Sequence, residues 1–185
     1  MRLRTWSIAG VATAALAFAG YALAVHAPGS ASTASATGSA TTKSDITTKT
    51  CSVSGQNFEL TKGTFSGTAS SAQALLNGPI QLKVDSWIDT SASNVGLLKA
   101  HFTINGPGPG KTDGKLDAAN SNGTLSGWID GHGPGDNHFS GTFTGSWTKD
   151  AGFTSLSIGT STGTNVVVVF SGKCPEPKKP KKPKH

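Results

Sequence analysis

Apolar residues recur at every second position through most of the chain between residues 51 and 174. In "PIQLKVDSW" (79–87), Ile80, Leu82 and Val84 share one face, and polar residues occupy the other. This period predicts half-buried strands. The same alternation runs through the segments 96–104, 114–118, 123–129, 139–147, 153–159 and 165–174. With the segment 50–67, these predict roughly eight strands joined mostly by short turns, and "SAQALLNG" (71–78) offers one turn of helix.

A five-residue motif with glycine at both ends occurs three times, as "GTFSG" (63–67), "GTLSG" (123–127) and "GTFTG" (141–145). In each copy the apolar residue and both glycines share a face, and the hydroxyl residues lie on the other. Glycine is useful inside a strand where the sheet bends sharply or an aromatic ring lies over the backbone. The repeat therefore predicts a closed, strongly coiled sheet, an all-β up-and-down barrel. A two-sheet β-sandwich is the alternative.

The first 24 residues have the features of a secretory signal peptide. Arg2 and Arg4 precede an uncharged run, and Ala22 and Ala24 offer the small residues that a signal peptidase reads. We expect a secreted or cell-surface protein that keeps no membrane span after cleavage. An uncleaved N-terminal membrane anchor is the alternative localisation, since the apolar run is about as long as the shortest spanning helix.

Residues 25–45 are rich in Ser, Thr, Ala and Gly and have no large apolar residue before Ile46 apart from Val25. Such a composition predicts a flexible spacer. Residues 46–174 then form one β-barrel domain of ordinary size.

The C-terminal segment 175–185 interleaves lysine with proline, which predicts an extended, solvated tail. Its five lysines are Lys178, Lys179, Lys181, Lys182 and Lys184. Residues 43–174 carry as many lysines as acidic residues, so the formal charge of +6 arises from the two ends of the chain. The composition therefore does not indicate a nucleic-acid-binding surface. The partner expected for the tail is an anionic cell-wall polymer or polysaccharide.

The chain has two cysteines, Cys51 and Cys174. In an exported protein an isolated pair most often forms a disulfide, which we predict here.

The segment "IDGHGPGDNHF" (129–139) carries the residues most suited to chemistry. Asp130, His132, Asp136 and His138 fall within nine residues, and such side chains bind transition metals. Because Gly, Pro, Asp and Asn are also ordinary turn residues, an ordinary exposed hairpin loop is the favoured interpretation of the segment.

No segment supplies the nucleophile elbow, free catalytic cysteine or phosphate-binding loop of an enzyme, and no cofactor is predicted. Trp128 is out of register with Leu125 and Ile129 and should point outward, where it could stack on a sugar ring. The sequence thus predicts an exported, non-enzymatic binding or cell-surface module. The alternative is a secreted metal-dependent protein or enzyme that uses the 130–138 loop.

Overall fold

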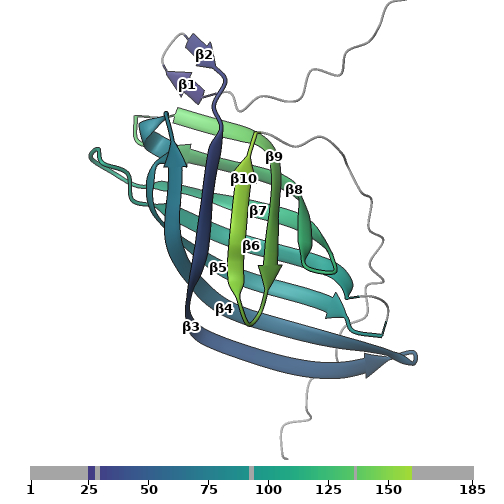
Figure 1. Ribbon diagram of the computed structural model, residues 1–185. Helices are drawn as coiled ribbons and strands as arrows, with labels where there is room; N and C mark the ends of the chain where they lie inside the picture. The colour runs from purple at the N-terminus through teal and green to yellow at the C-terminus, as the bar shows by residue number, and fades with distance from the viewer. Residues whose placement is uncertain (1–24, 28–29, 92–93, 136, 160–185) are drawn as a thin grey trace, which may run out of the picture.

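The computed structural model describes residues 25–27, 30–91, 94–135 and 137–159 (Figure 1). Its main body is a closed antiparallel barrel of eight strands, in the order β10-β3-β4-β5-β6-β7-β8-β9. The barrel strands are β3 (Ala36–Val53), β4 (Gln56–Ser71), β5 (Gly78–Asp89), β6 (Val95–Ile104), β7 (Thr112–Ser121), β8 (Thr124–Gly133), β9 (Asn137–Thr148) and β10 (Gly152–Ile158). The short strands β1 (Val25–Ala27) and β2 (Ser30–Ser32) pair with each other outside the barrel.

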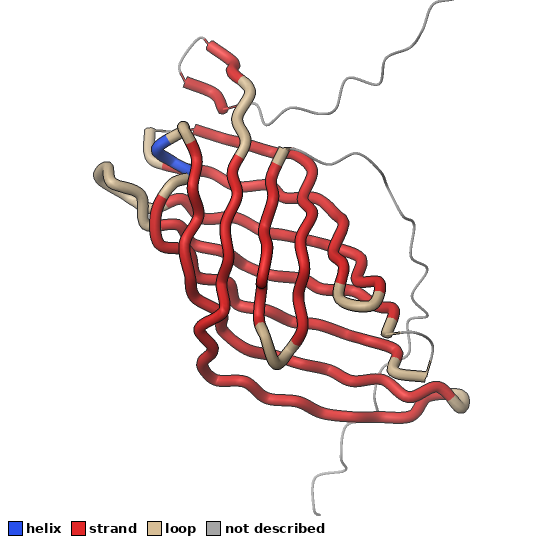
Figure 2. The backbone as a smooth tube through the Cα atoms, in the orientation of Figure 1, coloured by secondary structure: helices blue, strands red, loops and turns tan. Residues whose placement is uncertain are grey.

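Each barrel strand pairs with its neighbours in sequence, and β10 closes the sheet against β3. The predicted up-and-down barrel is thus confirmed. The 3-10 turn η1 (Ala74–Leu76), blue in Figure 2, is the one helical turn of the described chain, and it falls in the segment 71–78 where such a turn was expected. No helix in the described ranges has the length and hydropathy of a membrane span.

The inward face of the barrel is filled by apolar side chains. Phe65, Phe102, Phe143 and Phe153 are essentially inaccessible to solvent and belong to one continuous core. Trp147 is buried, as the alternation of apolar and polar residues predicted. Its ring packs edge to face against Phe65, with ring centroids 6.2 Å apart. The alternation of apolar and polar residues therefore identified the core face correctly.

Two glycines inside the strands lie where a neighbouring backbone or ring leaves no room for a side chain. A Cβ at Gly67 would lie 1.9 Å from the Ser39 carbonyl oxygen, beside the irregularity that shifts the β3–β4 register between Ser39 and Thr42. Gly114 lies directly opposite Phe102, whose ring would be 2.4 Å from a Cβ there. Both uses of glycine that the repeat suggested, at a bend and beneath an aromatic ring, are present.

One glycine of the repeat has a different role. Gly123 was expected inside a strand, but it follows Asn122 in the turn between β7 and β8, and both residues have positive φ. An Asn-Gly pair with two left-handed residues suits a two-residue hairpin turn, because its twist matches the flanking strands. The strand β8 therefore begins at Thr124.

The boundary between spacer and barrel was also misplaced. Residues 36–45 were assigned to the flexible spacer 25–45, but β3 begins at Ala36 and pairs with both β4 and β10. Ala36 and Ala40 are buried in the core. Small residues fit there because bulky rings from facing strands fill the interior, and a pattern search for large apolar residues does not detect such positions. The predicted signal peptide (1–24) and the segment 160–185 lie outside the described residues.

Candidate functional site: a groove across four strands

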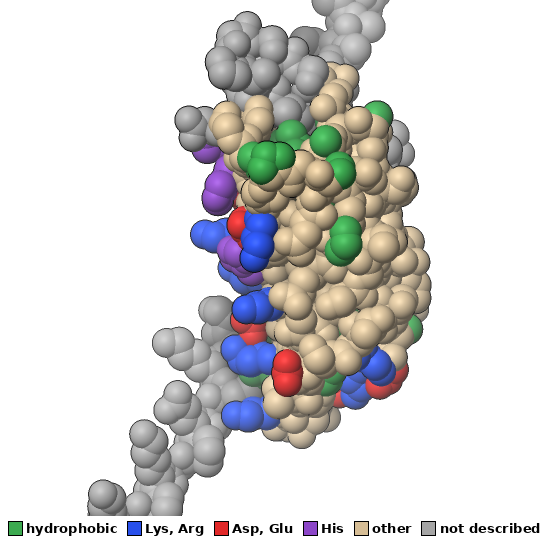
Figure 3. Space-filling model, turned by 90° about the vertical axis from the view of Figure 1, so that its left-hand side faces the viewer, with side chains coloured by type: hydrophobic (Ala, Val, Ile, Leu, Met, Phe, Trp, Pro, Cys, Tyr) green, Lys and Arg blue, Asp and Glu red, His purple; other side chains and the backbone are tan. Residues whose placement is uncertain are grey.

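Charged side chains collect on one side of the outer face of the barrel (Figure 3). The strand register arranges them in two parallel rows that cross β4, β5, β6 and β7. The first row consists of Lys62, Asp85, Lys99 and Asp117. The second row consists of Thr64, Lys83, His101 and Lys115. Between the rows is an open hollow of about 580 Å³, which we call the lysine groove; Asp45 of β3 lies at its edge.

The two rows differ in electrostatic character. In the first row the signs alternate, and Lys62 binds Asp85 at 2.6 Å while Lys99 approaches Asp117 at 3.4 Å. Each of these lysines is therefore largely neutralised by its neighbour. In the second row Lys83, His101 and Lys115 are direct cross-strand neighbours, and neither lysine forms an ion pair with a described residue.

Trp128 continues the first row onto β8, directly opposite Asp117. It points outward as expected, and 40% of its surface is exposed, more than that of the other described large apolar residues. Asp130 continues the second row, opposite Lys115. The Trp128 indole therefore lies beside the β7 end of the lysine groove, where Asp130 is opposite Lys115.

The predicted metal loop is a tight hairpin between β8 and β9. His132 and His138 lie directly opposite each other on these strands, with ring centroids 6.4 Å apart. Asp136 lies outside the described residues, and Asp130 is two pairs further along the hairpin, opposite Ser140. Within the described ranges no group of three or more His, Cys, Asp or Glu residues is close enough to hold a metal ion. The hairpin unites two of the four predicted ligands, and the metal site stays a prediction.

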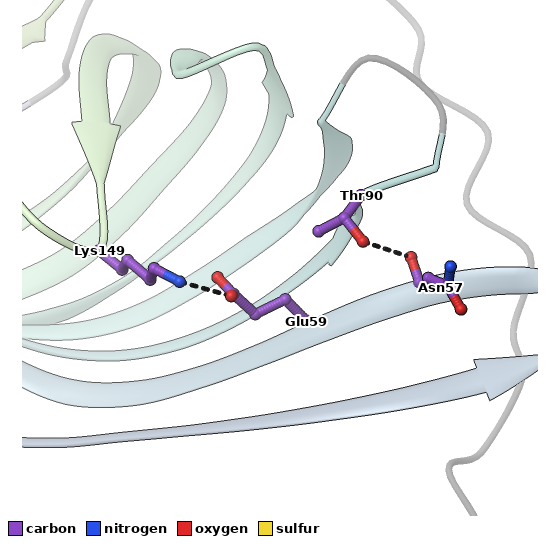
Figure 4. A network of polar contacts seen from close by, with 4 residues as sticks. All are labelled: Asn57, Glu59, Thr90 and Lys149. Carbon is purple, nitrogen blue, oxygen red and sulfur yellow. Dashed lines mark hydrogen bonds and ion pairs between the residues drawn. The ribbon is translucent and has the colours of Figure 1, made fainter.

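The barrel also has a polar mouth at the end where the β9–β10 turn meets β4 (Figure 4). Lys149 of this turn donates to the Glu59 carboxylate at 2.5 Å, and Lys43 donates to the Asp150 carbonyl at 2.6 Å. Nearby, the Thr90 hydroxyl donates to the Asn57 carbonyl at 3.1 Å. The two lysine bonds tie the β9–β10 turn to the curved β3–β4 ribbon, and the Thr90 bond ties the residue after β5 to β4. Asn120 and Trp147 help to line a hollow of about 330 Å³ at this end of the barrel.

The Lys149–Glu59 pair predicts a measurable pH dependence of stability. The hydrogen bond that Lys149 donates to the Glu59 carboxylate raises the pKa of Lys149 above its usual 10.5, despite partial desolvation. A raised folded-state pKa means that this stabilisation is fully present below about pH 10.5 and is lost as the pH rises through the folded pKa. Because Lys149 retains 36% of its side-chain exposure, we expect only about 1 kcal/mol.

Urea unfolding of Lys149→Met should therefore show a loss of about 1 kcal/mol at pH 7 that shrinks above pH 10.5. The more exposed Lys62–Asp85 pair provides the matched control, and Lys62→Met should cost less. Equal losses in the two variants would contradict a specific role for the mouth pair.

Some predicted site residues fall outside the described chain. Cys51 lies near the end of β3, directly opposite Phe58, but Cys174 and the tail lysines Lys178, Lys179, Lys181, Lys182 and Lys184 are not described. The disulfide and the tail contacts therefore stay predictions. Sequence reasoning missed the lysine groove, because Lys83, His101 and Lys115 are far apart in sequence and only the strand register brings them together.

Comparison of the chain with protein-family models, with curated proteins and with solved structures gives no match.

Proposed function

We propose that this chain is an exported, non-enzymatic β-barrel module that binds an anionic cell-surface carbohydrate in its lysine groove. The observation that carries the proposal is the row of Lys83, His101 and Lys115, in which neither lysine forms an ion pair with a described residue, although Asp130 lies opposite Lys115. The predicted signal peptide and Lys/Pro tail support the exported location and the sign of the ligand's charge.

Lys83 and Lys115 lie on β5 and β7, on either side of His101, so their ammonium groups gather in one area of the outer face. In the first row Lys62 and Lys99 each have an aspartate carboxylate within 3.4 Å, whereas neither Lys83 nor Lys115 forms an ion pair with a described residue. A polyanion that lies in the groove would contact both ammonium groups. A carbohydrate is favoured over a compact anion because the groove is open and crosses four strands, a length of roughly 15 Å at the usual strand spacing.

Trp128 favours an acidic carbohydrate over other polyanions as the ligand. Its partly exposed indole lies at the end of the groove, where a flat apolar ring can stack on the face of a sugar. The outward Ser and Thr residues, such as Thr64 and Thr103, add hydroxyl groups along the same face. The C-terminal lysines would supply a second, non-specific attraction to the same polymer.

The groove is tested by measuring binding of the secreted chain to an acidic polysaccharide, for example polygalacturonate, at low and high salt. In Lys83→Gln/Lys115→Gln we expect about tenfold weaker binding, since two surface contacts of about 0.7 kcal/mol each amount to that ratio. Binding by the unaltered chain should weaken as salt screens the charges.

The matched control, Lys49→Gln/Lys111→Gln, removes the same charge from exposed positions outside the groove. It should change binding less than twofold. Equal losses of affinity in the two double variants would show that binding depends on the overall charge of the chain and not on the groove. Binding that is lost only when residues 175–185 are removed would show that the tail binds the polysaccharide.

A further inference from the structure

The outer face of the barrel carries an apolar patch near the β3–β4 turn. It consists of Phe58, Leu60, Trp87 and Leu97, which we call the outer patch. Leu60, Trp87 and Leu97 are direct cross-strand neighbours on β4, β5 and β6, and they lie on the same side as the charged rows. Phe58 adjoins them, with its ring centroid 5.8 Å from that of Trp87.

Phe58 is buried although it points away from the core. Even-numbered residues of β4, such as Lys62 and Thr64, face outward, whereas Phe65 and the other odd-numbered residues face inward. The register between β4 and β5 is continuous from Phe58 to Ala69, so no irregularity turns Phe58 inward. Nevertheless only 3% of Phe58 is exposed, and it is not part of the core cluster. Trp87 contacts one side of the ring.

We infer that residues 166–174 of this same chain cover the outer patch, with Cys174 bonded to Cys51. Three observations select this occupant. Cys51 is the direct cross-strand partner of Phe58, so a bond to Cys51 brings the preceding residues onto the patch. The segment contains four consecutive valines and Phe170, the apolar chemistry that such a patch accepts. The third observation is the length of the connecting chain.

The distance from the end of β10 to Cys51 fits the number of residues available. Ile158 is the partner of Ala36, and β3 runs from Ala36 to Cys51 in fifteen steps. The chain from Ile158 to Cys174 has sixteen steps. An extended segment that follows β3 across the outer face therefore reaches Cys51 without slack for a separate domain.

Successive side chains of an extended chain point to opposite sides, which determines which residues of 166–174 would contact the barrel. Val168, Phe170 and Cys174 share one face, so these side chains turn toward the barrel while Val167 and Ser171 turn away. In this arrangement the charged tail after Cys174 leaves from the β3–β4 turn, on the side of the barrel that carries the lysine groove.

The test uses the full secreted chain and measures amide hydrogen exchange of residues 56–61 and 86–88. Phe170→Asp should increase their exchange rates about tenfold by uncovering Phe58, whereas Ser171→Asp, on the opposite side, should leave them unchanged. Digestion without reduction should yield a linked peptide pair that contains Cys51 and Cys174. Unchanged exchange in Phe170→Asp, or a disulfide between two copies of the chain, would overturn the inference.

A milder pair of variants covers the case in which Phe170→Asp does not fold. Val168→Ala should increase the exchange rates of the same residues about threefold, while Val167→Ala should not. Equal effects of the two alanine variants would equally overturn the inference.

Discussion

Phe65→Ala is expected to lower the free energy of unfolding by about 4 kcal/mol, the largest effect that we predict for a single side-chain truncation. Phe65 is inaccessible to solvent and packs edge to face against Trp147 and Phe153, with ring centroids 6.2 and 5.6 Å away. Because these partners come from β9 and β10, Phe65 joins strands from both sides of the closure between β10 and β3. The cavity left by alanine would lie at the centre of this contact.

Urea unfolding with the cysteines in their native state would measure the change, with the slope of the transition compared between variants. Thr68→Ala, an exposed position on the same strand, should remain within about 0.5 kcal/mol of the unaltered protein. A loss below about 1 kcal/mol for Phe65→Ala would show that the three rings do not form a packed core.

Gly67→Ala is expected to lower the free energy of unfolding by about 3 kcal/mol, although it adds a single methyl group. That methyl group would lie 1.9 Å from the Ser39 carbonyl oxygen and 2.6 Å from the Ala40 Cα. Both atoms belong to backbone, so a rotamer change cannot relieve the contact, and β3 must move away from β4 at the register shift that helps to close the barrel.

Gly108→Ala is the matched control for Gly67→Ala, because a Cβ at Gly108 would meet no atom within 4 Å. It should be neutral or slightly stabilising, since alanine lowers the entropy of the unfolded chain. Thermal or urea unfolding of the two variants separates a steric effect from the general effect of removing glycine. Similar stability of the two would contradict the close approach of β3 and β4.

Much of this fold was predictable because most strands have one apolar and one polar face. The period identified β5 and β6 nearly to the residue, and it placed Trp147 inside and Trp128 outside. It failed at β3, where Ala36 and Ala40 are core residues too small to stand out among serines and threonines. The period-two pattern also failed at Gly123, since the same five-residue motif can begin in a strand or in a hairpin turn.

The lysine groove was less predictable than the fold. Each strand showed which residues face outward, but the row of Lys83, His101 and Lys115 depends on how the strands align. A shift of one residue would move Lys83, His101 and Lys115 to the other face of the sheet, and a shift of two would separate them into different rows. The local motif 130–138, which was visible in sequence, yields only the facing pair His132 and His138 in the described chain.

The most direct test of the proposed function is an NMR titration of the isotopically labelled full chain with a defined acidic oligosaccharide. Saturable shifts centred on Lys83, His101, Lys115 and the Trp128 indole are the result that the proposal predicts. Shifts confined to residues 175–185, with the outer face of β5 to β8 unchanged, would contradict binding in the lysine groove.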